Sequence, residues 1–162
     1  VESTILDVRQ DIPVIRRPGM ITQKMLSQAL GCEVSISTDF DTRTPGMHAR
    51  HYAPQTAIAL MSTNELLDFL AQKRASTAND HQQMFGLLIY SSTLLDAIHD
   101  IHPCYCPIIM PSDATLYARF LYDRLRTLDQ MSFKRIIIEA VPRDESWEAI
   151  RDRLRRACCR IQ

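Results

Sequence analysis

The feature that most constrains the fold is an alternation, from Thr56 onward, of short continuous apolar runs with segments of helical period. Runs of this length without a polar face are typical of strands buried on both sides. The sequence predicts strands at 57–61, 85–90, 106–110 and 135–140, and helices at 63–73, 113–128 and 147–159. Ser62 and Glu65 would form a capping box at the start of the first of these helices. The apolar positions expected on the inner faces of the three helices are Leu66, Leu67, Phe69 and Leu70, then Leu116, Phe120, Leu121, Leu125 and Leu128, then Trp147, Ile150 and Leu154. This order predicts an α/β fold, with a Rossmann-like, mostly parallel sheet covered by helices on both faces.

The first 36 residues have a different pattern. Two short strands are expected at 4–8 and 14–16, followed by a helix that the Thr22 hydroxyl caps and that ends at Gly31. The apolar face of this helix would be Met25, Leu26, Ala29 and Leu30. A hairpin and one helix do not form an independently stable domain. Because the sequence also opens without methionine, we expect a partial α+β segment cut from a longer chain.

The composition limits the function classes. Lys plus Arg and Asp plus Glu number 19 each, so no global field attracts nucleic acid and phosphate binding must be local. A hydrophobic content of 46% is typical of a globular protein, and no apolar run predicts a membrane span or signal peptide. Five cysteines without repeated spacing favour a reducing compartment, so we expect a cytoplasmic location.

A polar linker is predicted at 37–55, and its second half is rich in groups that can bind a ligand. Pro45-Gly46 opens this stretch and Pro54 closes it, and between them lie His48, Arg50, His51 and Tyr52. Cationic and aromatic side chains in this combination suit an anion attached to an aromatic surface. The residues alone leave two interpretations open, a ligand-contacting segment and a solvated tether.

Two other places could bind a ligand. Arg17 stands directly before a Pro18-Gly19 turn, where its planar guanidinium could face a phosphate or simply lie on the surface. Tyr90-Ser91-Ser92 follows a predicted strand, at the edge where α/β sheets bind ligands, but a plain turn is the simpler interpretation. The four glycines form no phosphate-binding loop.

A metal site is not expected. The spacing of the candidate ligands matches no standard zinc site, and the last of these ligands, Cys106, lies in a predicted strand. They are His99, His102, Cys104 and Cys106.

Three motifs follow one another in a telling order: Glu2-Ser3-Thr4-Ile5-Leu6-Asp7, then Arg17-Pro18-Gly19, then the stretch from Pro45 to Pro54. In this order they resemble the two-domain threonylcarbamoyl-adenylate synthases, which join a YrdC-like catalytic domain through a linker to a Rossmann-like domain. The resemblance implies a remnant of the catalytic domain at 1–36, a linker or lid at 37–55 and a Rossmann-like C-terminal domain at 56–162.

The resemblance also implies a reaction. The family is a nucleotidyltransferase that makes threonylcarbamoyl-AMP and pyrophosphate from L-threonine, bicarbonate and ATP, with Mg²⁺ accompanying ATP and no prosthetic group. The product feeds N6-threonylcarbamoyladenosine formation in tRNA, with downstream transferase machinery as a partner and no direct nucleic-acid or membrane binding. By this resemblance Ser3 and Arg17 contact the ATP or AMP phosphates, and the lid residues Arg50, His51 and Tyr52 contact the nucleotide.

The sequence departs from the family in three places. His48 and Ala49 replace the usual lysine and tyrosine, and the stretch 143–147 replaces a glycine-containing one. The family's basic strand motif and Ser-x-Asn motif would lie before Val1, so no complete catalytic set is expected and the chain alone should be inactive. The alternative is a non-catalytic regulatory or ligand-binding α/β module that positions the lid or docks a tRNA-modification partner.

Overall fold

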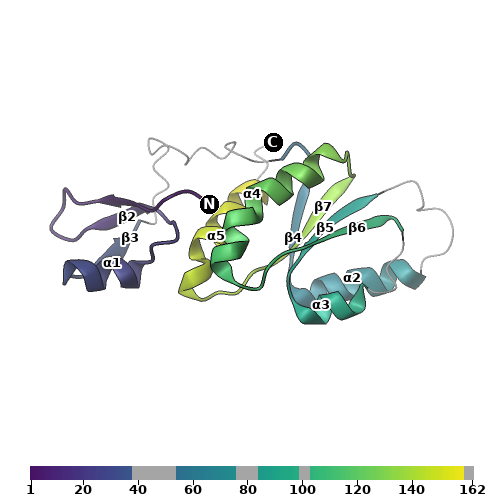
Figure 1. Cartoon of the computed structure of the whole chain (residues 1–162), viewed down its shortest axis with the longest axis horizontal. Coiled ribbons are helices and arrows are strands. Elements are labelled where there is room, and N and C mark those ends of the chain that lie inside the picture. Colours follow the sequence, from purple (N-terminus) through teal and green to yellow (C-terminus); the bar gives the residue numbers. More distant parts are fainter. Residues whose placement is uncertain (38–53, 76–83, 99–102, 159–162) are drawn as a thin grey trace. The chain divides into compact units, whose positions relative to one another are not determined.

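The computed structural model describes residues 1–37, 54–75, 84–98 and 103–158 (Figure 1). The chain forms two compact units, Val1–Ala53 with Pro142–Cys159, and Pro54–Val141 with Arg160–Gln162. These units place the C-terminal helix with the N-terminal segment. The boundaries expected from the sequence, 1–36, 37–55 and 56–162, follow the pattern of elements instead and remain a prediction.

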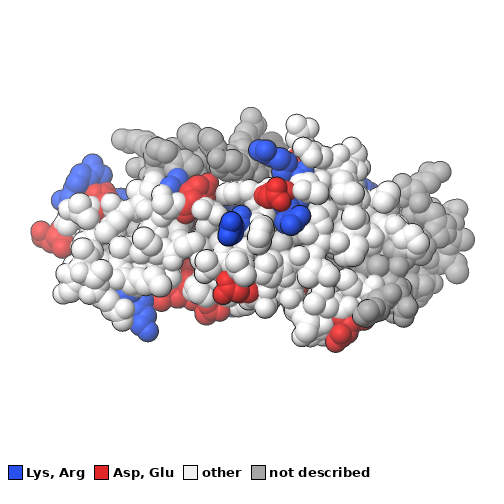
Figure 2. Space-filling model, in the orientation of Figure 1, with Lys and Arg blue, Asp and Glu red and all other residues white. Residues whose placement is uncertain are grey.

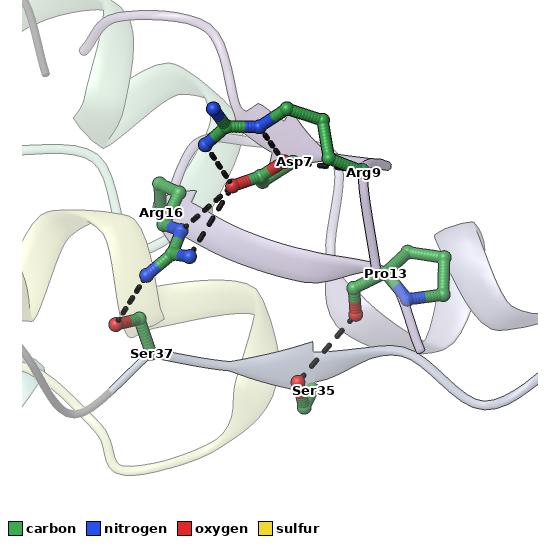
Figure 3. Close-up of polar contacts among 6 residues, drawn as sticks. All are labelled: Asp7, Arg9, Pro13, Arg16, Ser35 and Ser37. Atoms are coloured by element: carbon green, nitrogen blue, oxygen red, sulfur yellow. Dashed lines mark hydrogen bonds and ion pairs between the residues drawn. The ribbon is translucent and has the colours of Figure 1, made fainter. Parts of the chain in front are cut away.

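The first unit begins with a small mixed sheet. Its strands are β1 (Ile5–Asp7), β2 (Val14–Arg17) and β3 (Ser35–Ile36), in that order. The β1–β2 pair is antiparallel, as predicted. Strand β2 also pairs in parallel with β3, which is too short to be predicted from its sequence. A guanidinium cluster also joins the strands: Asp7 accepts hydrogen bonds from Arg9 and Arg16, and Arg16 reaches Ser37 (Figure 3).

Helix α1 (Gln23–Leu30) has both predicted ends. The Thr22 hydroxyl accepts a hydrogen bond from the backbone N–H of Met25 at 3.3 Å, and Gly31 ends the helix in the left-handed region at φ 67°. The predicted buried face is wrong for this structure, because no residue of α1 is buried and Met25 and Leu30 are 55% and 48% exposed. The spacing identified an apolar face, but Leu26 is only half-buried and the other three residues of that face are exposed.

The C-terminal part of the first unit is a 3-10 turn, η1 (Glu145–Trp147), that leads into α5 (Glu148–Cys158). Trp147, Ile150 and Leu154 are buried, as the sequence predicts. The Glu145 carboxylate accepts a hydrogen bond of 2.7 Å from the backbone N–H of Lys24, in the first turn of α1. This contact joins two segments of the unit that are far apart in the sequence.

The second unit is the predicted Rossmann-like sheet. Its four parallel strands have the order β4-β7-β5-β6. They are β4 (Ile58–Met61), β5 (Phe85–Ile89), β6 (Tyr105–Ile109) and β7 (Arg135–Glu139). The helices are α2 (Thr63–Ala75), α3 (Ser92–Ala97) and α4 (Ala114–Gln130), and α2 and α3 lie together, apart from α4 (Figure 1). The α/β fold class is therefore confirmed.

The core of the second unit follows the predicted apolar positions closely. Leu66 and Leu70 of α2 pack with Leu87 and Ile89 of β5. The predicted capping box is present, because the Glu65 carboxylate accepts hydrogen bonds from the backbone N–H and hydroxyl of Ser62, both at 2.7 Å. In α4, Leu121, Leu125 and Leu128 are buried as predicted.

The prediction that Leu116 of α4 is buried is wrong. Leu116 is 44% exposed, and its neighbour Tyr117 is fully buried in its place. An aromatic ring one position along the helix fills the space that the leucine pattern assigned to Leu116.

Charged residues of both signs are interspersed on the face of the molecule that Figure 2 shows. Over the described residues, no helix combines the length and the apolar character that a membrane span requires.

Candidate functional site

Ser3 and Arg17, the two residues predicted to contact phosphate, lie together in the first unit. Arg17 Nε donates a hydrogen bond of 3.1 Å to the Ser3 carbonyl oxygen, and Arg17 Nη2 donates one of 3.3 Å to Ser3 Oγ. Arg17 is only 8% exposed, whereas Ser3 is exposed. The guanidinium therefore lies on the buried side of the serine, and the Ser3 hydroxyl, which accepts a hydrogen bond from it, belongs to the more exposed of the two residues.

The turn after Arg17 lies directly against the segment that carries Ser3. A Cβ at Gly19 would stand 2.2 Å from the backbone nitrogen of Thr4 and 2.6 Å from the carbonyl carbon of Ser3. Only glycine permits this approach. Thr4 Oγ1 also donates a hydrogen bond of 2.8 Å to the Ile21 carbonyl. The two motifs recognised separately in the sequence thus form one tightly packed corner.

Beside this corner lies a depression with an empty volume of about 270 Å³. Pro18, Gly19 and apolar side chains line most of it, together with the carboxylates of Glu145 and Glu148. Carboxylates repel a phosphate, so this depression does not suit the anion that Ser3 and Arg17 would bind.

Arg153 of α5 connects the same corner to the C-terminal helix. Its Nε donates a hydrogen bond of 2.7 Å to Glu2 Oε2, and its Nη2 donates one of 3.2 Å to the Pro18 carbonyl. Nη1 pairs with Asp152, which also accepts a hydrogen bond of 2.9 Å from Arg156 Nε. Arg153 was not predicted as a site residue, because the sequence marks it only as one of several arginines in the last helix.

The remaining predicted site residues, Arg50, His51 and Tyr52, lie outside the described residues, as do His48 and Ala49. In the first unit the chain leading to them is held by β2, because Ser37 donates its backbone N–H to the Ile15 carbonyl at 3.0 Å.

In the second unit, Asp129 fixes the chain where it leaves the linker. Its carboxylate accepts hydrogen bonds from the backbone N–H groups of Gln55 and Thr56, at 3.0 and 2.8 Å. Burial alone would raise the pKa of Asp129, but these two hydrogen bonds outweigh it and hold the pKa below its ordinary value. Asp129 is a second residue that sequence reasoning left without a role.

At the carboxyl edge of the parallel sheet, where α/β proteins bind ligands, the buried side chain of Glu139 bonds to the neighbouring turns. Glu139, at the end of β7, is fully buried, and its carboxylate accepts hydrogen bonds from Thr63 Oγ1 at 2.8 Å and from the backbone N–H groups of Tyr90 and Ser91 at 2.8 and 3.0 Å. The Ser91 hydroxyl caps α3. The Tyr90-Ser91-Ser92 segment is therefore a turn bound to an internal carboxylate.

Two further titratable groups have perturbed pKa values. Burial, the Glu139 carboxylate and Tyr90 raise the pKa of Tyr117, so its phenol stays neutral. Hydrogen bonds from the Arg9 side chain and backbone, with a further one from Arg16, hold the pKa of Asp7 below its usual range (Figure 3).

Among the described residues, no group of three His, Cys, Asp or Glu side chains lies close enough together to hold a metal ion. Cys104 and Cys106 are half-buried in or beside β6, and His99 and His102 lie outside the described residues.

The fold and this corner define a class: an α/β protein in which a Rossmann-like unit accompanies an α+β segment with a paired hydroxyl and guanidinium. A family model described as "Threonylcarbamoyl-AMP synthase, C-terminal domain" matches residues 21–159, and the chain belongs to this family. The resemblance seen in the sequence is thereby confirmed.

Two curated relatives carry the name threonylcarbamoyl-AMP synthase. The Schizosaccharomyces pombe protein is 27% identical over 97% of this chain and 42% of its own length. The Bacillus subtilis protein is 28% identical over 97% of this chain and 45% of its own length. The chain thus spans less than half the length of these relatives.

Two solved structures share the fold. The crystal structure of P. abyssi Sua5 complexed with L-threonine has a TM-score of 0.71 at 22% identity, over 97% of this chain and 45% of that one. A variant of the same protein, with a consecutive histidine and tyrosine changed to alanine, has a TM-score of 0.73 at 21% identity, over 98% and 45% of the two chains.

Proposed function

We propose that this chain is part of an L-threonylcarbamoyladenylate synthase, which makes threonylcarbamoyl-AMP and pyrophosphate from L-threonine, bicarbonate and ATP. The observation that carries the proposal is the family match over residues 21–159, in a chain that also aligns along 97% of its length with two proteins named for this activity. The product serves N6-threonylcarbamoyladenosine formation in tRNA.

The corner at Ser3 and Arg17 supplies the phosphate contacts in this proposal. The Ser3 hydroxyl donates to a phosphate oxygen of ATP, and the Arg17 guanidinium behind it fixes the hydroxyl and adds positive charge. Fixed donors of this kind stabilise the charge that develops on a phosphoryl group during transfer. ATP is bound with Mg²⁺, and no prosthetic group takes part.

The linker completes the site in this proposal. Arg50, His51 and Tyr52 face the nucleotide and exclude water, which would hydrolyse the adenylate. The order His51-Tyr52 is that of the histidine and tyrosine changed in the P. abyssi variant. The enzyme acts in the cytoplasm as an ATP-binding nucleotidyltransferase and passes its product to the tRNA threonylcarbamoyl transferase machinery.

The test is product formation by the natural full-length protein, measured as threonylcarbamoyl-AMP from L-threonine, bicarbonate and ATP. Arg17→Met should abolish product formation, whereas Arg9→Met, on the same hairpin but exposed, should leave it unchanged. His51→Ala and Tyr52→Ala should each lower the rate. Full activity of Arg17→Met would exclude the assigned role, and an inactive wild-type protein would exclude the function.

The alternative, a non-catalytic module with its own ligand, is disfavoured by Glu139. A ligand at the carboxyl edge of the sheet would have to displace a carboxylate that already holds Thr63, Tyr90 and Ser91. The 162-residue chain should therefore bind neither ATP, AMP nor L-threonine in calorimetric titrations and should turn over no ATP. Binding to this chain would favour the ligand-sensing alternative.

A further inference from the structure

We propose that Arg153 is a positioning residue for ATP: by joining Glu2 to Pro18 it sets the spacing of Ser3 and Arg17. This inference rests on the proposed function, because it takes Ser3 and Arg17 as phosphate contacts. It adds a role for the C-terminal helix in binding ATP.

The contacts of Arg153 are selective. Glu2 directly precedes Ser3, and Pro18 directly follows Arg17, so the guanidinium reaches the neighbour of each site residue at 2.7 and 3.2 Å. Arg17 itself forms the inner connection, to the carbonyl and hydroxyl of Ser3. The two arginines therefore bridge the same pair of chain segments side by side.

The burial of Arg153 indicates why it has to be an arginine. The residue is 6% exposed, and a charge buried to this degree is stable only when its donors are satisfied. The planar guanidinium offers nitrogens in three directions, toward Glu2, Pro18 and Asp152. A lysine would carry the same charge on a single nitrogen and could not keep all three contacts.

The ion pairs around Arg153 alternate in charge. Arg153 and Arg156 carry two positive charges, and Glu2 and Asp152 carry two negative ones. Asp152 is 5% exposed and holds both arginines in α5. The position of the Arg153 guanidinium is thus fixed from the helix side, so that it can transmit the position of α5 to the corner.

The consequence is that phosphate binding depends on the last helix of the chain. Without Arg153, the Glu2-Ser3 segment and the Arg17-Pro18 segment lose their outer bridge, and Glu2 is left with a half-buried carboxylate lacking this partner. The loss of one hydrogen bond to a charged phosphate oxygen costs roughly 10-fold to 100-fold in binding affinity. The loss of affinity should be confined to ligands that carry phosphates, because neither Glu2 nor Pro18 is assigned a contact to the nucleoside.

The experiment measures the Kd of ATP and of adenosine for the natural full-length protein by calorimetry. Arg153→Met should weaken ATP binding at least about 10-fold and leave adenosine binding unchanged, with the effect of Arg153→Lys in between. Arg155→Met is the matched control, because Arg155 lies on the same helix with its side chain 58% exposed and should bind both ligands like the wild type. Glu2→Gln should reproduce part of the effect and add little to Arg153→Met.

Three results would overturn the proposal: an unchanged ATP Kd for Arg153→Met, an equal loss of ATP and adenosine affinity, or a wild-type protein that binds no ATP. If Arg153→Met does not fold, Arg153→Lys and Glu2→Gln carry the same comparison. Product formation by the wild type is measured separately, so an enzyme that binds ATP but makes no threonylcarbamoyl-AMP contradicts the proposed function and not the positioning role.

Discussion

Asp129 Oδ1 lies 2.8 Å from the backbone nitrogen of Thr56, so the last turn of α4 holds the chain two residues after Pro54, where the second unit begins. An acidic side chain in the last turn of a helix opposes the helix dipole. The placement is understandable only through the hydrogen bonds to Thr56 and Gln55. The contact determines where the chain leaves the linker.

Replacing Asp129 should loosen the start of the second unit. Asp129→Ala should lower the free energy of unfolding by about 1–2 kcal/mol, because two backbone donors lose a charged acceptor, and Asp129→Asn should cost less, because the amide oxygen still accepts one of them. Urea unfolding followed by circular dichroism measures the difference. Asp123→Asn, on the exposed side of the same helix, is the control and should match the wild type.

The same contact predicts a pH dependence. The folded pKa of Asp129 is below its ordinary value, so its stabilisation is fully present above about pH 4 and is lost as the pH falls through the folded pKa. The stability difference between wild type and Asp129→Asn should therefore shrink as the pH is lowered below about 4. A difference that stays constant over this range would contradict the hydrogen-bonded carboxylate.

Much of the second unit could be predicted because its local and global signals agree. Apolar runs of strand length mark β5 and β7, the Ser62 and Glu65 pair marks the start of α2, and burial follows the helical period. The order of strands in the sheet and the buried Glu139 were not predictable. Both depend on which segments meet in space, and a single glutamate after an isoleucine-rich run carries no local signal for its partners.

The candidate site could be predicted only in part, and its role in phosphate binding remains a prediction. Ser3 and Arg17 were recognised through motif order, and the structure brings them within hydrogen-bond distance. Arg153 was not recognised because its partners lie more than 130 residues away and helix α5 contains several other arginines. Periodicity describes one element at a time, so a contact between the first and last elements of a unit escapes it.

Glu139 should be essential to the carboxyl edge of the sheet. Glu139→Ala removes the acceptor for Thr63, Tyr90 and Ser91 and should destabilise the protein by about 3 kcal/mol, since buried donors are left unsatisfied. Glu139→Gln should cost about 1 kcal/mol, because its oxygen can accept the two backbone N–H groups while the rotating Thr63 hydroxyl accepts from its amide.

The measurement for Glu139 is hydrogen exchange of the β5 and β7 peptides. Exchange should accelerate strongly in Glu139→Ala and weakly in Glu139→Gln. The opposite order would mean that Glu139 is held by its charge and not by the number of its acceptors. Thr63→Ser, which keeps the hydroxyl, should behave like the wild type, whereas Thr63→Val should resemble a mild version of Glu139→Ala.

Of the two glycines that the structure describes in the first unit, Gly19 should be the less replaceable. In Gly19→Ala the new methyl group would meet the backbone of Ser3 and Thr4, at 2.6 and 2.2 Å, and backbone atoms cannot rotate away as a side chain can. We expect a loss of about 2–3 kcal/mol from overpacking. The only tryptophan, Trp147, is buried in the same unit, so its fluorescence during urea unfolding reports the change.

Gly31→Ala separates crowding from backbone strain in this test. A methyl group at Gly31 would meet nothing within 4 Å, but φ is 67°, and this left-handed conformation costs a residue with a side chain about 1–2 kcal/mol. Gly19→Ala should therefore be the more damaging change, and in the natural full-length protein it alone should also weaken ATP binding, because it separates Ser3 from Arg17. Equal stability losses for the two variants would mean that the corner can open without cost, and the close packing of Gly19 on Thr4 would then not be what holds Ser3 beside Arg17.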